Sequence, residues 1–120
     1  MADSLAFDRT VLAAVATEHG IGEERLRELV EDHQAGIEEL PGVENLVYEW
    51  RKQFDGTVVE QTDSTYYLAV PDWVWNEFGD RLDLGEDELA ALATVHERQV
   101  QARTDADGPD DGETYLLLER

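Results

Sequence analysis

The chain has 120 residues, and its 29 Asp and Glu against 9 Lys and Arg give a formal net charge of −20. This length, with 42% hydrophobic residues, predicts a single domain, and the absence of cysteine excludes disulfides, thiolate catalysis and cysteine metal sites. No apolar run approaches the roughly 18 residues of a membrane span, and Met1–Ser4 lacks the pattern of a signal peptide. We therefore expect a soluble cytoplasmic protein that does not associate with membranes.

The acidic residues are spread evenly over the chain, and only one of the nine basic residues, Lys52, is a lysine. An acidic tail would indicate a disordered interaction segment, but an even acidic coat does not. This composition resembles that of the cytosolic proteins of haloarchaea. The resemblance implies a protein that requires molar salt, where the Debye length is about 3 Å and like-charge repulsion is largely screened. An acidic protein from an ordinary cell is the alternative.

The N-terminal part of the chain predicts helices. Residues 5–19 carry an apolar stripe, with Asp3 or Ser4 as the N-cap and Gly20 as a C-terminal stop. A second helix is expected to begin at Glu23, with an apolar stripe that starts at Leu26.

Gly36 interrupts this second helix at a cost of about 1 kcal/mol relative to alanine, so the helix either breaks there or runs on to Leu40. The clearest amphipathic pattern follows and predicts a third helix over Val43–Phe54. The segments Thr57–Gln61 and Thr65–Val70 are rich in Val, Thr and Tyr, with a polar turn between them, and predict a β-hairpin.

The C-terminal half predicts two more helices and a strand. Asp72 caps a short helix that runs through Phe78, and Asp83 with Glu86 forms a capping box before the fifth helix. Thr114–Leu118 predicts a terminal strand. The expected fold is α+β, with about five helices and a small antiparallel sheet made of the hairpin and this strand. We expect one domain over 1–120, composed of 5–70 (helices and hairpin), 71–104 (helical), 105–112 (acidic loop) and 113–120 (strand).

The order of three helices and a hairpin over 5–70 resembles that of the winged helix-turn-helix superfamily. In this comparison Val43–Phe54 is the recognition helix and the hairpin is the wing. The resemblance implies DNA binding through the polar side of that helix, which carries Asn45, Tyr48, Arg51 and Lys52. In the alternative, Arg51 and Lys52 only solvate the helix and pair with neighbouring carboxylates.

Patterns for catalysis and metal binding are weak. His19, His33 and His96 lie on three predicted helices, and imidazoles with a carboxylate suit zinc, iron or nickel, but no HxxxH or HExxH spacing prearranges a pair. In the acidic loop, Pro109 and Asp110 occupy positions where an EF-hand requires Asp or Asn and then Gly. Neither serine lies in a G-x-S-x-G elbow. We expect no catalytic residue, metal or cofactor.

Aromatic residues are concentrated around the fourth predicted helix. Trp73 and Trp75 point about 200° apart on a helix, so one of them is expected at a surface, groove or subunit interface, unless the core wraps both sides. The terminal strand is apolar on both faces and needs cover from the core or a second subunit. The predicted interface residues are Tyr67, Trp73, Trp75, Phe78, Leu116 and Leu118.

These patterns favour a non-catalytic protein-interaction module of a salt-adapted cytoplasm, which forms a homodimer or binds another protein. A winged-helix DNA-binding transcriptional regulator is the alternative. A metal-dependent enzyme built on the histidines is a minor third class.

Overall fold

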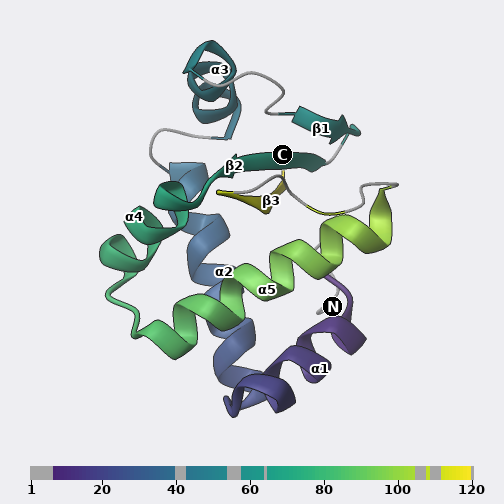
Figure 1. The fold of residues 1–120 in the computed structure, drawn as a ribbon, viewed down its shortest axis with the longest axis vertical. Coiled ribbons are helices and arrows are strands. Elements are labelled where there is room, and N and C mark those ends of the chain that lie inside the picture. Colours follow the sequence, from purple (N-terminus) through teal and green to yellow (C-terminus); the bar gives the residue numbers. More distant parts are fainter. Residues whose placement is uncertain are drawn as a thin grey trace.

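The computed structural model describes residues 7–39, 43–53, 58–63, 65–104, 108 and 112–119. These residues form five helices and a three-stranded antiparallel sheet, which confirms the expected α+β class (Figure 1). The helices are α1 (Arg9–His19), α2 (Glu23–Glu39), α3 (Val43–Gln53), α4 (Asp72–Leu82) and α5 (Glu86–Arg103). The strands are β1 (Val58–Gln61), β2 (Thr65–Pro71) and β3 (Glu113–Glu119).

The sheet has the order β1-β2-β3, so the hairpin and the C-terminal strand belong to one sheet, as predicted. β2 and β3 pair without interruption from Thr65–Glu119 to Pro71–Glu113, whereas the β1–β2 register shifts between Val58 and Glu60. Every β2 side chain from Thr65 to Val70 is buried, and β1 is largely exposed. The central strand is therefore covered on both faces.

The second helix is continuous through Gly36, because α2 runs from Glu23 to Glu39. Its stripe of buried residues, which includes Leu26, Leu29 and His33, packs into the core. This tertiary packing offsets the low helix propensity of glycine. Leu40, Phe54 and Thr57, which were predicted as ends of elements, lie outside the described residues.

The N-caps differ from the predicted ones. α1 begins at Arg9 with Asp8 as its N-cap, instead of at residue 5 after Asp3 or Ser4. α4 has Pro71 as its N-cap and continues four residues beyond Phe78. Gly20 is the left-handed C-cap of α1, as predicted, with φ 67°.

The predicted capping box at Asp83 and Glu86 is wrong. Asp83 is instead the C-cap of α4 in the left-handed region, with φ 58°, and Gly85 is the N-cap of α5. Helices often end on such a residue, and the short polar side chain of aspartate tolerates this conformation better than most. The backbone N–H of Leu84 then donates to the carbonyl oxygen of Gly79.

The outer edge of β3 is covered by side chains of α2 and α5. The Leu117 N–H donates to Nδ1 of His96 at 2.9 Å. Nε2 of Gln34 donates to the Leu117 carbonyl oxygen at 2.8 Å, and Oε1 of Gln34 accepts from the Glu119 N–H at 2.9 Å. The Gln34 amide therefore bonds to the edge as the peptide group of another strand would, and the strand receives its cover from the chain's own core.

Helix α5 packs along β3 and against α1, and α4 lies close to α5 (Figure 1). A Cβ atom at Gly79 would lie 2.8 Å from Cδ2 of Leu89, so glycine permits this close approach. None of the helices in the described ranges combines the length and apolarity that crossing a lipid bilayer requires.

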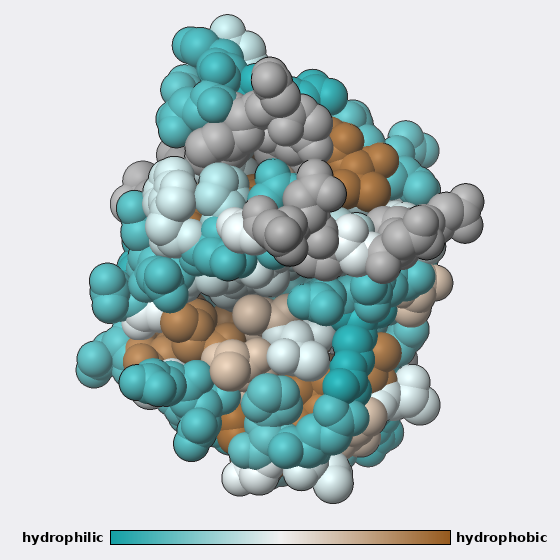
Figure 2. Space-filling model, in the orientation of Figure 1, coloured by the Kyte–Doolittle hydropathy of each residue, from teal (hydrophilic) through white to brown (hydrophobic). Residues whose placement is uncertain are grey.

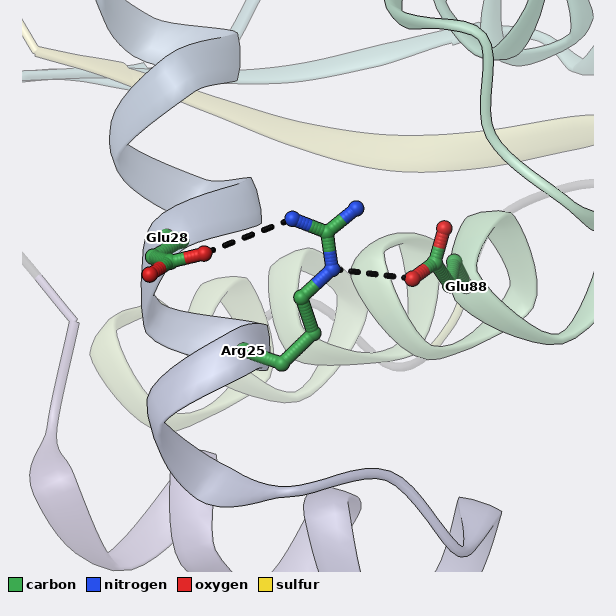
Figure 3. Close-up of polar contacts among 3 residues, drawn as sticks. All are labelled: Arg25, Glu28 and Glu88. Carbon is green, nitrogen blue, oxygen red and sulfur yellow. Dashed lines mark hydrogen bonds and ion pairs between the residues drawn. The ribbon is translucent and has the colours of Figure 1, made fainter.

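Ion pairs among the described residues are confined to α1 with its N-cap, α2 and α5. Arg25 of α2 pairs with Glu28 on its own helix at 3.4 Å and with Glu88 of α5 at 2.9 Å (Figure 3). The remaining pairs also join these helices: Arg9 with Glu23, Arg98 with Glu18, and Arg103 with Asp8. These contacts hold the three helices together at their exposed surfaces.

Candidate functional site

A groove of about 190 Å³ lies between α3 and α4, and we call it the α3–α4 groove. Leu46 and Trp50 of α3 are four residues apart and therefore share one side of that helix. The residues of α4 that line the groove are Trp73, Val74, Glu77, Phe78 and Arg81. Trp50, Val74 and Phe78 are buried, whereas Glu77 and Arg81 are exposed. The groove thus combines apolar buried residues with an exposed acid and an exposed base.

The size of the α3–α4 groove argues against a metabolite site. Small-molecule pockets typically enclose about 300–1,000 Å³, well above the 190 Å³ found here. Among the described residues, the lining contains no histidine, serine or cysteine and only one carboxylate, so these residues offer neither a nucleophile nor a paired acid and base. A groove of this kind suits a single anchoring side chain of another protein.

Few of the large hydrophobic side chains in the described part of the chain are exposed. The face drawn in Figure 2 is mostly hydrophilic, with its hydrophobic residues in separate small patches. Among the described residues Tyr48 is 62% exposed, Trp73 46% and Val59 39%. Only Trp73 of these three lines the α3–α4 groove.

The two tryptophans of α4 point in different directions, as their spacing predicts. Trp75 is 3% exposed and packs in the core, whereas Trp73 is 46% exposed. The expectation that one of them lies at a surface or groove is confirmed, and that residue is Trp73.

The other predicted interface residues are not available on the surface of the monomer. Tyr67 and Phe78 are 4% and 7% exposed, and Leu116 and Leu118 are fully buried. The prediction that Leu116 and Leu118 lie at an interface is therefore wrong. The terminal strand is apolar on both faces because it lies inside the chain's own core, between β2 and the helices.

The predicted DNA-binding residues lie on a different side of α3. Asn45, Tyr48, Arg51 and Lys52 are all exposed, and Nζ of Lys52 lies 5.2 Å from the centre of the Tyr48 ring. Tyr48 is two positions from Leu46, which turns it about 160° around the helix from the groove. The two candidate surfaces are therefore separate.

The predicted wing has an uneven environment. β1 is exposed and carries Glu60, and the turn carries Asp63, so this hairpin end is acidic. The turn is closed by the Thr62 N–H, which donates to the Thr65 carbonyl oxygen at 2.8 Å. β2, the second strand of the hairpin, is the buried centre of the sheet.

Two of the three histidines meet in the core. The ring centres of His33 and His96 are 5.0 Å apart, and Trp75 packs against both at 5.2 and 4.8 Å. Nδ1 of His96 accepts a hydrogen bond from the Leu117 N–H, so the proton of the neutral ring is on Nε2. The Gln34 amide nitrogen lies 3.4 Å from Nδ1 of His33 and can only donate, which places the His33 proton on Nε2 as well.

This hydrogen bonding shows why the histidine pair is not arranged as a metal ligand set. A protonated Nε2 has no lone pair to give to a metal. Nε2 of both rings and Nε1 of Trp75 are buried without a hydrogen-bond acceptor among the described residues. His33 and His96 meet edge to face, as His33 and Phe78 do with ring centres 4.4 Å apart, and Trp75 stacks on His33 with the ring planes 16° apart.

Burial also controls the charge of the histidine pair. Desolvation lowers the pKa of His33 from 6.5 to about 3. It lowers the pKa of His96 well below 6.5 too, with a smaller contribution from the neighbouring His33. Both rings are therefore neutral at pH 7. His19 ends α1, and no group of three or more His, Asp or Glu in the described ranges is arranged to hold a metal ion.

Several sequence motifs fall outside the described residues. Ser4 and Ser64 are among them, as are the aspartates of the acidic loop, where only Gly108 is described between Thr104 and Gly112.

Sequence reasoning did not find the groove or the buried glutamines. Leu46 and Trp50 lie in the apolar stripe of α3, and this pattern predicts that both side chains are buried. It does not show that α4 leaves a groove beside them. Gln34 and Gln99 are 4% and 0% exposed, although glutamine is usually a surface residue. Gln34 follows His33 on the stripe of α2, and only the position of β3 explains its burial.

Comparison with known proteins gives a family and no relatives of described function. No curated protein and no solved structure matches the chain significantly. The family described as "Domain of unknown function (DUF8048)" matches residues 5–118, which is nearly the whole sequence. The chain therefore belongs to the DUF8048 family.

Proposed function

We propose that this domain is a non-catalytic protein-binding module of a salt-rich cytoplasm, and that it receives its partner in the α3–α4 groove. The observation that carries the proposal is the 46% exposure of Trp73 beside the buried residues of that groove. Tryptophan is among the residues that contribute most to protein interfaces, especially next to a well-packed pocket. A partner side chain in the groove would cover the indole and remove apolar surface from water.

The proposal is tested by co-purification from the native cytoplasm in molar KCl, with nuclease added. We expect a stoichiometric protein partner with the natural chain, and its loss with Trp73→Ala. Tyr48→Ala is the matched control, because it removes another exposed aromatic ring from the opposite side of α3. Retention of the partner by Trp73→Ala, or equal loss with both variants, contradicts docking in the groove.

DNA binding is the second candidate function, and one observation favours it. Arg51 and Lys52 are exposed and make no ion pair within the described part of the chain, whereas Arg9, Arg25 and Arg98 each pair with a carboxylate. Unpaired cations on one helix side are the groups that contact phosphates.

The test of this second function is charge reversal at Arg51 and Lys52 together. If the domain binds DNA, fluorescence anisotropy with mixed genomic fragments should show saturable binding that the double variant loses. Arg27→Glu is the control, since Arg27 lies on α2 and belongs to no ion pair of the described residues. Equal DNA affinity of the natural chain and the double variant contradicts this function.

A further inference from the structure

We propose that the occupant of the α3–α4 groove is a second copy of this chain, docked through a two-fold contact between the two α4 helices. This inference depends on the proposed function of the groove as a docking site. It adds the identity of the partner and a geometry in which each copy supplies the same residues.

The shape of the patch suits contact with itself. In a two-fold interface the same surface meets itself, so it must contain both a part that projects and a part that receives. Trp73 is 46% exposed, and the buried Phe78 lines the adjacent recess. Trp73 and Phe78 are five residues apart, about 1.4 turns of α4, so a recess beside Phe78 can lie at the centre of the contact while the indole of one copy meets the Arg81 end of the other copy's groove.

The charges of the patch are also self-complementary. Trp73, Glu77 and Arg81 are spaced four apart and form one exposed stripe on α4. Glu77 and Arg81 belong to none of the ion pairs of the described residues. Each therefore remains available to a group on another molecule.

An antiparallel arrangement brings these residues together. A two-fold axis beside Phe78 places Arg81 of one copy opposite position 75 of the other, which is midway between Trp73 and Glu77 on the stripe. There the guanidinium can stack on the indole and bond to the carboxylate. The symmetry repeats these contacts, so one stripe provides two guanidinium–indole contacts and two ionic contacts.

The net charge makes this association dependent on salt. Each copy carries a formal charge of −20, so two copies repel each other in dilute buffer. In molar KCl the Debye length falls to about 3 Å, which removes the long-range repulsion and leaves the short-range contact at α4.

The experiment is sedimentation velocity over a range of protein concentrations in molar KCl. We expect a monomer–dimer equilibrium for the natural chain and a dissociation constant raised about tenfold or more by Arg81→Glu or by Glu77→Arg. The chain that carries both substitutions regenerates the opposite charges across the axis and should recover the dimer. Trp73→Ala should also weaken the dimer, and Val59→Ala, which changes an exposed residue of β1, should not.

Circular dichroism confirms that each variant is folded, and the double charge exchange tests the geometry without removing the indole. A natural chain that stays monomeric overturns the second-copy proposal. Dimers that survive both single reversals, or that the double exchange fails to restore, overturn the two-fold α4 contact. A monomeric chain that still co-purifies with a different protein, lost in Trp73→Ala, leaves the docking function intact and contradicts only the second copy.

Discussion

Two regions of this molecule differ in how their surfaces are used. The helical body, which we define as α1, α2, α5 and β3, contains every ion pair among the described residues. The α3–α4 region, which includes β1, contains none of these pairs, but it carries the three exposed large hydrophobic residues Tyr48, Val59 and Trp73. In Figure 1, α3 lies at the periphery, across the sheet from α1 and α5.

The difference separates stability from recognition. In the helical body, polar side chains bond to one another and to the β3 backbone, as Gln34 and His96 do. In the α3–α4 region, Glu77 and Arg81 belong to no ion pair of the described residues and can contact another molecule. Substitutions in the body should therefore change stability, and those of exposed residues that line the α3–α4 groove should change association.

The largest effect is expected from Leu116→Ala, a substitution in the core strand. Leu116 is fully buried, so the loss of its side chain should cost about 2–5 kcal/mol of unfolding free energy. Trp73→Ala should change stability far less, because Trp73 is half exposed. Urea denaturation in molar KCl measures both. A stable Leu116→Ala chain that fails only to associate would contradict the assignment of this residue to the core.

Gln34→Ala should have the next largest effect. It leaves the buried Leu117 carbonyl without the Gln34 amide, at a cost of about 1–3 kcal/mol, and it also removes the bond from the part-buried Glu119 N–H to Gln34. Gln53→Ala is the control, because Gln53 is an exposed glutamine of α3. Denaturation curves compare the two, and hydrogen exchange at Glu119 should accelerate only in Gln34→Ala. Similar stabilities would show that the edge of β3 does not need this amide.

The histidine pair should make the helical body sensitive to acid. In the folded chain, the pKa values of both rings lie below 6.5, which is the pKa of a histidine in the unfolded chain. The folded pKa of His33 is about 3. Below pH 6.5 the unfolded chain binds protons that the folded chain does not, so stability falls as the pH falls. The expected slope is about 1.4 kcal/mol per pH unit for each histidine.

Denaturation between pH 6.5 and 5 measures this slope, and above pH 6.5 the effect should disappear. His33→Phe keeps a ring of similar shape and should reduce the slope by about half. An unchanged slope in this variant would mean that other groups are responsible.

The smallest effect is expected from Arg103→Gln at the surface of the body. Hydrogen bonds from Gln99 and then Arg103 lower the pKa of Asp8, but both members of the Arg103–Asp8 pair are more than a third exposed. Water and salt screen such pairs, so we expect a cost of about 0.2–1 kcal/mol in dilute salt and less in molar KCl. Melting temperatures at two salt concentrations test this. A cost that grows with salt would contradict a screened ion pair.

The sequence by itself determined the features that depend on neighbours along the chain. Helical and alternating patterns identified α3, the hairpin and the α+β class, and the spacing of Trp73 and Trp75 showed that they must diverge. Gly20 was recognisable as a helix end because few other residues adopt its left-handed conformation.

The tertiary structure alone decided which residues cover β3. Thr65 pairs with Glu119 although more than fifty positions separate them in the chain, and no local pattern records such a partner. The burial of Gln34 follows from that pairing, since its side chain bonds to the free edge of the strand. The same holds for the α3–α4 groove, because a gap between two helices depends on how the whole chain packs, and local periodicity reports only which side of each helix is apolar.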